Sequence, residues 1–209
     1  MKAIDTLISR YPDLDPVRES IEAAAKALIE TYENGNKVMV CGNGGSASDS
    51  EHIVGELMKG YFLKREVSDS VRENLKSHFP DDGDYLADHL QGALPAISLV
   101  SQSALVSAYA NDVAAEMVYA QQVYGYGKAG DALIALSTSG NSRNVINAVK
   151  VANALGVRTI GMTSAKGGQL AELCDITISA PRESTPDVQE LHLPIYHAIC
   201  ELLEGHFFG

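Results

Sequence analysis

The chain has 209 residues, enough for one sizeable α/β domain that can bury a full core without disulfides or structural metals. Its formal net charge of −11 at pH 7 argues against a nucleic-acid or anionic-membrane partner, since both need clustered Lys and Arg. No apolar run approaches the length of a membrane span, and the three cysteines are widely spaced without a CxxC pair, which indicates core residues of a protein of the reducing cytoplasm.

Apolar side chains recur every three or four positions through residues 14–33, and this period predicts an amphipathic helix. The Asn-Gly-Asn sequence at residues 34–36 can form a left-handed C-cap, after which the chain turns directly into a strand. Residues 38–41 are all apolar, without alternation, as expected of a parallel strand that is covered on both faces.

A glycine-rich loop, Gly-Asn-Gly-Gly-Ser at residues 42–46, lies between this strand and a predicted helix at residues 47–61. Its glycines allow a sharp turn and leave backbone N–H groups accessible, while Ser46, Ser48 and Asp49 can each cap the helix. Free N–H groups at a helix start favour an anion, so we expect the loop to hold the anionic end of a substrate. The spacing fits neither the ATP-binding nor the NAD-binding glycine motif, so no nucleotide cofactor is predicted; a glycine turn without a ligand is the alternative.

Residues 64–92 lie in the most charged stretch of the chain and are typical of an added surface element. Apolar residues at helical spacing in residues 67–75 and again in residues 85–90 predict two helices, separated by the turn-forming Pro-Asp-Asp-Gly at residues 80–83. We therefore expect a helical insertion on the surface.

The rest of the chain alternates predicted strands with predicted helices. Further strands are expected at residues 94–99, 132–136, 158–162 and 176–178, and helices at residues 111–124 (capped by Asn111-Asp112), 143–155, 167–173 and from 185 to the end. This alternation predicts an α/β fold: a three-layer αβα sandwich with a doubly wound parallel sheet of about five strands, in a single domain of residues 1–209. Ligands of such sheets bind at the carboxyl ends of the strands, where strand order reverses.

A second candidate ligand loop follows the strand at residues 132–136. Four hydroxyl donors lie there within six residues: Ser137, Thr138, Ser139 and Ser142. Gly140 allows a tight turn before a helix start, and uncharged donors at a helix start suit a phosphate group, so we predict a second phosphate cradle. A turn that merely caps its helix accounts for Ser142 but poorly for all four hydroxyls.

Four motifs in this order resemble the sugar isomerase (SIS) family: residues 42–46, Asn111-Asp112, residues 137–142 and Gln189-Glu190-Leu191-His192. Within that family the chain is most similar to the bacterial phosphoheptose isomerases, over nearly its whole length except about residues 64–92. The resemblance implies an SIS fold and an enzyme that isomerises sedoheptulose 7-phosphate to D-glycero-D-manno-heptose 7-phosphate through an enediol. It also implies a homotetramer with active sites near the subunit interfaces, and the apolar faces of the helices at residues 14–33 and 186–204 exceed what one small sheet can cover.

The resemblance implies which residues act on the sugar. Glu56 and His197 would do the chemistry, and a carboxylate with an imidazole is the usual pair for moving a proton between adjacent carbons while serving the oxygens. The implied substrate contacts are Asn43, Gly44, Gly45, Ser46, Asn111, Asp112, Ser137, Thr138, Ser139, Ser142 and Gln189.

Zinc is a second implication, because some family members bind it at the positions that match His52, Glu56, Gln189 and His197. His52 and Glu56 are four residues apart and therefore share one helix face, as two ligands must. Gln189 and His197 are separated by about two turns, and Pro194 can bend the helix between them. His192 lies on another face from His197 and is interpreted as a packing residue.

Other functions stay open at this point. A non-catalytic SIS protein of the type that associates with the bacterial replication initiator resembles the chain nearly as well, although that branch tends to lack a histidine at the position of His197. A phosphosugar-binding protein of other specificity is a further alternative, while a phosphosugar-sensing regulator would usually carry a DNA-binding domain, which is not recognised here. His52 and Glu56 also fit a plain exposed histidine and an ordinary surface acid.

Overall fold

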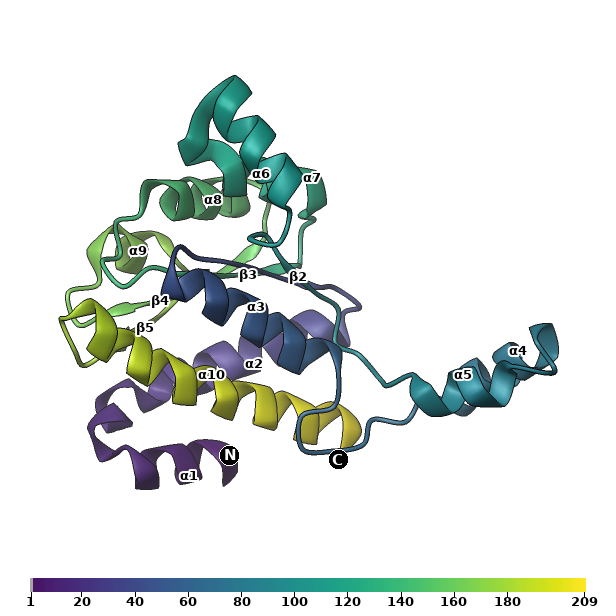
Figure 1. Cartoon of the computed structure of the whole chain (residues 1–209). Helices are drawn as coiled ribbons and strands as arrows, with labels where there is room; N and C mark the ends of the chain where they lie inside the picture. Colours follow the sequence, from purple (N-terminus) through teal and green to yellow (C-terminus); the bar gives the residue numbers. More distant parts are fainter. Residues whose placement is uncertain (1) are drawn as a thin grey trace.

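Five parallel strands form the middle layer of the computed structural model, which describes residues 2–209 (Figure 1). In chain order they are β1 (Val38–Cys41), β2 (Ala96–Ser98), β3 (Ala132–Leu136), β4 (Arg158–Ser164) and β5 (Ile176–Ala180). Their order in the sheet is β2-β1-β3-β4-β5, and every neighbouring pair is parallel. The predicted doubly wound α/β sheet is confirmed.

Helices cover both faces of the sheet, which is why its strands are apolar at consecutive positions. Along β1, Val38 and Val40 face one core, while Met39 and Cys41 face the other. The first core is closed by α1 (Lys2–Arg10), α2 (Arg18–Glu33), α3 (Gly45–Met58) and α10 (Thr185–Phe208). The second core is closed by α7 (Val118–Tyr126), α8 (Arg143–Ala154) and α9 (Gly168–Leu173).

Helix α1 was not predicted, and it changes the argument for oligomerisation. Its side chains Ile4 and Leu7 are buried in the same core as α2 and α10. The apolar faces of α2 and α10, expected to be left uncovered by a small sheet, are therefore covered within the chain.

Two predicted helix starts were wrong, each for a local reason. Helix α2 begins at Arg18 because residues Pro12–Val17 form a 3₁₀ turn, and a proline inside that turn lacks the N–H that an α-helix needs. Helix α3 begins at Gly45, with Gly44 at φ +56° as its N-cap and no capping side chain. The predicted caps Ser46, Ser48 and Asp49 therefore lie inside α3.

The segment around Asn111-Asp112 also differs from the prediction, because it does not cap a helix. Helix α6 (Ser103–Tyr109) runs on into a π-helical turn at Ala110–Ala114, which contains both residues, and then into a 3₁₀ turn at Ala115–Met117. Helix α7 starts only at Val118, without a side-chain cap.

The charged insertion is a hairpin of two helices, α4 (Asp69–His78) and α5 (Gly83–His89), that projects from the sandwich (Figure 1). The helices cross closely, since a Cβ on Gly83 would lie 2.5 Å from the Lys76 Cα atom. Arg72 of α4 pairs with Asp88 of α5 at 2.8 Å. The predicted helical insertion is confirmed.

The cysteines behave as predicted for small core residues. Cys41 and Cys200 are buried, Cys174 is half-buried, and all three are free thiols. Burial raises the pKa of Cys200 to about 12, so its thiol is un-ionised at neutral pH. No helix within residues 2–209 combines the length and apolarity needed to cross a bilayer.

Candidate active site

The two predicted phosphate loops leave neighbouring strands at the point where strand order reverses. Strand β1 pairs with β2 on one side and with β3 on the other, and Cys41 at its end is in register with Ala135 near the end of β3. Ligands of doubly wound sheets bind at this switch point. The side chains of Asn43, in the first loop, and Asn144, just after the second, exchange hydrogen bonds of 2.8 and 2.9 Å. The loops therefore form one continuous surface.

In the second loop, the hydroxyl groups of Ser139 and Ser142 lie beside that of Ser137. Its Oγ atom lies 3.0 Å from Ser142 Oγ and 3.5 Å from Ser139 Oγ, and it also accepts the Ser142 backbone N–H at 3.4 Å. Thr138 faces away from this group, toward the Thr185 hydroxyl at 3.4 Å. A cluster of hydroxyls at the start of α8 can turn its protons toward an anion.

The first loop is covered by Gln189 from α10. A Cβ atom on Gly45 would lie 2.5 Å from the Gln189 Nε2 atom, so only glycine admits the amide at this position. The Ser46 side chain, next in the chain, is 3% exposed. Gln189, Gly44, Gly45 and Ser46 thus meet where the dipole of α3 is positive.

The predicted catalytic pair meets where α3 passes α10. His52 Nε2 lies 3.3 Å from the Glu56 carboxylate, one turn farther along α3, and 3.5 Å from His197 Nε2 on α10. Lys59 Nζ approaches the other Glu56 oxygen at 3.4 Å. The sequence predicted Glu56 and His197 as partners, and His52 lies directly beside both.

Tyr196, which the sequence did not single out, and Asp49, which it predicted only as a helix cap, fix the tautomer of His52. The Tyr196 hydroxyl donates to Asp49 Oδ1 at 3.2 Å and lies 2.9 Å from His52 Nδ1. A phenol has one proton to donate, so His52 Nδ1 must be the donor in its bond to Tyr196. The lone pair of neutral His52 is therefore on Nε2, which faces Glu56 and His197. The helical spacing of Asp49 and His52 was the one available signal in the sequence.

Facing acceptors at this distance need a proton or a cation between them. The donor set of His52, Glu56 and His197 has the N and O atoms that zinc takes, and both measured separations are close to about 3.4 Å, the edge of a tetrahedron of ligands 2.0–2.1 Å from zinc. Within residues 2–209, however, no group of three or more His, Cys, Asp or Glu side chains is placed so that it could hold a metal ion. Gln189, the fourth predicted ligand, lies over Gly45.

A cavity of about 250 Å³ opens beside His197. It is enclosed by α1, by α10 and by the chain just after α3, including Ala3, Leu7, Arg10, Tyr61, Phe62, Glu190 and Glu201. Burial, followed by the neighbouring His52, lowers the pKa of His197, so this imidazole is neutral at pH 7. A neutral imidazole beside a carboxylate can both donate and accept a proton.

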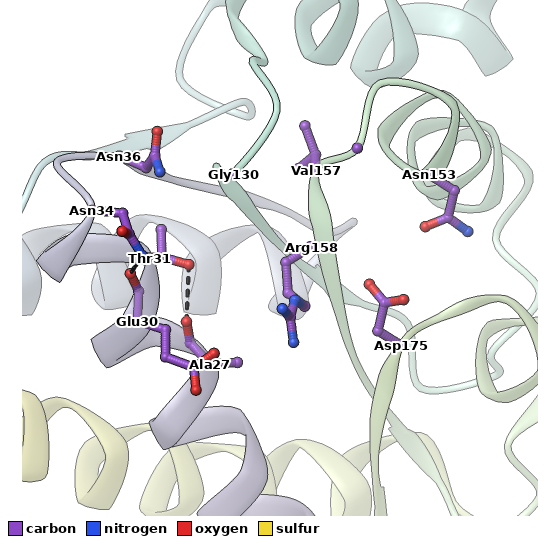
Figure 2. Close-up of a pocket in the computed structure, with 11 residues that line it drawn as sticks. Ala27, Glu30, Thr31, Asn34, Asn36, Gly130, Asn153, Val157, Arg158 and Asp175 are labelled. Atoms are coloured by element: carbon purple, nitrogen blue, oxygen red, sulfur yellow. Dashed lines mark hydrogen bonds between the residues drawn. The ribbon is translucent and has the colours of Figure 1, made fainter.

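A different cavity, of about 640 Å³, lies at the amino ends of the strands, on the opposite side of the sheet from the two loops (Figure 2). Its lining comes from α2 and from the amino ends of strands, with Arg158 at the start of β4 and Asp175 just before β5. Several of its polar groups already serve the fold: Asn153 donates to the Leu173 carbonyl at 2.8 Å, and Asp175 accepts the Thr159 N–H at 2.8 Å. Doubly wound sheets bind their ligands at the carboxyl ends of the strands and not at the amino ends.

Asn111 and Asp112 are the predicted contacts that the structure does not bring to the loops. Both are exposed, and the Asn111 amide donates to Asp112 at 2.9 Å. Within residues 2–209 no hydrogen bond joins either side chain to residues 42–46 or 137–142. Their place in substrate binding stays a prediction.

His192, interpreted from the sequence as a packing residue, is fully buried, and its Nε2 lies 3.4 Å from the Thr163 carbonyl. Burial lowers its pKa to about 4, against the opposing effect of that carbonyl. In the unfolded chain His192 is protonated near pH 6.5, whereas in the native state it is protonated only near pH 4. The stability that this residue contributes is therefore present above pH 6.5 and is lost as the pH falls toward 4.

Replacing His192 with Gln should remove this pH dependence. We expect the free energy of unfolding of the unchanged protein to fall by about 3 kcal/mol more than that of His192→Gln between pH 7.5 and pH 4. Urea denaturation of both proteins at several pH values measures the difference. His78→Gln, at an exposed histidine of α4, is the control and should titrate like the unchanged protein. Parallel curves for all three proteins would contradict the assignment.

The chain is similar to known proteins over most of its length. The model of the SIS domain matches residues 7–71 and 86–164, and the unmatched residues between them fall in the α4–α5 hairpin. The chain is 38% identical to a phosphoheptose isomerase of Aliarcobacter butzleri over 92% of its length and 88% of the relative. It is 36% identical to one of Helicobacter pylori, over 93% and 88%.

Solved structures give the same result. A phosphoheptose isomerase from Francisella tularensis superposes with a TM-score of 0.75 at 27% identity, covering 98% of this chain and 100% of that one. One from Neisseria gonorrhoeae superposes with a TM-score of 0.70 at 27% identity, covering 95% and 98%. The chain therefore belongs to the SIS-domain family, among the phosphoheptose isomerases.

Proposed function

We propose that the protein is an aldose–ketose isomerase that converts sedoheptulose 7-phosphate to D-glycero-D-manno-heptose 7-phosphate. One observation supports this most directly: His52 lies within 3.5 Å of both the Glu56 carboxylate and the His197 imidazole, and His197 lines a cavity. The relatives are named phosphoheptose isomerases, and the proposed reaction is the isomerisation of a phosphorylated heptose.

In this proposal the two loops hold the phosphate and the α3–α10 crossing moves protons. Ser137, Ser139 and Ser142 donate to the phosphate oxygens, with the start of α3 adding N–H groups. Glu56 removes a proton from C1 of the ketose while His197 donates one to the C2 carbonyl oxygen, which gives an enediol. Return of the Glu56 proton to C2, with loss of the O1 proton to His197, gives the aldose and restores both groups.

We also propose zinc as the metal of this site, with His52, Glu56 and His197 as ligands and Gln189 as the fourth. The N and O donor set and its spacing support this choice, and Tyr196 would orient His52 from behind. When bound, zinc would polarise the substrate carbonyl as a Lewis acid. The role of the protein is then to present these atoms on two helices that the core holds rigidly. The free cysteines fit the cytoplasm as the proposed compartment.

The direct test is incubation of the purified protein with sedoheptulose 7-phosphate, with and without added zinc, followed by chromatographic detection of the aldose phosphate. We expect the aldose phosphate to form from the ketose, and the ketose to form when the aldose phosphate is the starting substrate. If no C5 to C7 ketose phosphate turns over, the protein is better explained as a non-catalytic SIS protein that associates with the replication initiator.

Ser137→Ala and Ser139→Ala should weaken substrate binding and leave the fold intact. Each removes a hydroxyl donor to a charged phosphate, and loss of such a bond costs about 1.5 to 3 kcal/mol, or roughly a ten- to hundred-fold rise in KM. Steady-state kinetics measure this rise. Ser107→Ala on α6, whose hydroxyl donates to the Ala104 carbonyl at 3.1 Å, is the matched control and should keep its KM. An unchanged KM in both loop variants would refute the phosphate cradle.

A homotetramer is the proposed assembly, with active sites near the subunit interfaces. Because α1 covers the faces of α2 and α10, the support comes from other apolar side chains that the single chain leaves in solvent, such as Val113 at 64% and Tyr124 at 68% exposed. Light scattering at micromolar concentration should give the mass of four chains. The mass of one chain would contradict this proposal.

A further inference from the structure

Two opposite charges are buried together behind the proposed catalytic helix crossing. Arg65 follows α3 in the chain, and Glu204 lies near the end of α10. Their side chains are 0% and 1% exposed, and Arg65 Nε donates to Glu204 Oε1 at 2.8 Å. Burial of a charged pair usually gives little net stability compared with apolar side chains of the same size. Stability alone therefore does not explain why this pair is buried here.

The Glu204 carboxylate binds the backbone that leaves α3. It accepts the N–H groups of Tyr61 and Phe62, each at 2.7 Å, and that of Leu63 at 3.1 Å. Burial alone would raise the pKa of Glu204, but these N–H groups and Arg65 together hold it below its usual value. A charged carboxylate on α10 thus fixes the turn of residues 61–63 in place.

Arg65 binds the last turn of α3 itself. Its Nη2 donates to the Glu56 carbonyl at 2.9 Å, and its Nη1 donates to the Leu57 carbonyl at 2.7 Å. Carbonyls in the last turn of a helix have no partner within the helix, and a cation there also complements the helix dipole. The guanidinium lies 4.9 Å from the centre of the Phe208 ring, which completes its enclosure.

We infer that the Arg65–Glu204 pair is a positioning device that sets Glu56 of α3 against His197 of α10, an inference that rests on the proposed function. The pair joins the backbone of residue 56 to α10 about two turns beyond His197. It also holds Tyr61, whose ring centre lies 5.6 Å from that of His197. An error of about 1 Å in such a placement can cost a hundred-fold in rate.

Arg65→Lys and Glu204→Gln test the inference through the separation of kcat from KM. Lysine keeps the positive charge but loses the planar fork that reaches both carbonyls, and Gln keeps the shape of Glu204 but loses its charge. We expect kcat on sedoheptulose 7-phosphate to fall about ten- to hundred-fold, with KM changed less than about three-fold, because the phosphate loops lie elsewhere. Arg72→Lys, at the exposed ion pair of the hairpin, is the matched control and should retain full turnover.

The double variant Arg65→Met with Glu204→Leu provides the test if a single variant fails to fold. Proteins in which a buried ion pair is replaced by apolar side chains of similar size commonly fold. Circular dichroism and thermal unfolding confirm the fold before kinetics are measured. Low kcat in this folded double variant supports positioning. Wild-type kcat in any folded variant overturns the inference alone, whereas no turnover in the unchanged protein overturns the proposed function on which it rests.

Discussion

Glu56→Gln is expected to lose turnover by about 10² to 10⁴-fold while it keeps the fold, the assembly and the substrate affinity. The amide has the shape of the carboxylate but cannot take the proton from C1, and a positioned proton-transfer group contributes about this factor. Glu56 is 9% exposed and packs one turn from His52, so the isosteric change leaves little space or strain. Steady-state kinetics in both directions measure the loss. Full activity in this variant would rule out Glu56 as the base.

His197→Asn should show a loss of similar size, and metal analysis separates its two possible causes. If His197 acts as the acid, the variant retains any zinc that the unchanged protein holds. If it is chiefly a ligand, then Glu56→Gln, His197→Asn and His52→Ala should all lose metal together, and added zinc should partly restore activity. Elemental analysis of the three purified variants makes this distinction. Glu51→Gln, at an exposed acid on α3, is the control that should keep both metal and turnover.

Gly140→Ala is the second change with a large expected effect. Gly140 has φ +66°, and a Cβ there would lie 1.9 Å from the Gly167 carbonyl oxygen, an impossible approach to a backbone atom. The positive φ costs about 1–2 kcal/mol for alanine, and forced backbone movement adds about 1–3 kcal/mol. The loop that holds Ser139 and Ser142 must move, so we expect lower stability together with a large rise in KM. Urea denaturation and kinetics measure the two effects.

Gly35→Ala separates the clash from the backbone conformation. Gly35 has φ +72°, close to that of Gly140, but a Cβ there would have no heavy atom within 4 Å. We expect this control to lose about 1–2 kcal/mol of stability and to keep its KM. Equal losses of stability in the two variants would show that the contact with Gly167 has no energetic consequence.

The sequence predicted the strands and the two ligand loops because the signals for them are local. All-apolar runs predicted β1 and β3, and strands covered on both faces have that composition wherever they pair. The alternation of short apolar-rich runs with helical segments predicted the other three strands. Glycines and hydroxyls directly after β1 and β3 marked the loops, since a sharp turn and an anion site need those residue types. The four-residue spacing of His52 and Glu56 likewise placed them on one face of a helix.

Predictions from local signals were wrong or missing at three places in the chain. Asn111-Asp112 looked like a helix cap, yet the chain continues through a π-helical turn there. Ser46, Ser48 and Asp49 also looked like caps, but Gly44 occupies the N-cap position. Helix α1 was missed although Ile4, Leu7 and Ile8 recur at helical spacing, and only the structure shows that it packs in the same core as α10 from the other end of the sequence.

The sequence by itself therefore determined the class of fold and the position of the two candidate ligand loops, which depend on residues close together in the chain. Glu56 and His197 were predicted as catalytic groups from the family resemblance. Only the tertiary structure decided that β1 lies beside β3, that Tyr196 and Asp49 fix the tautomer of His52, and that Arg65 and Glu204 join α3 to α10. Each of these contacts joins residues far apart in sequence. Strand order and helix packing decide which residues come together in such a contact, and no local period or motif in the sequence encodes them.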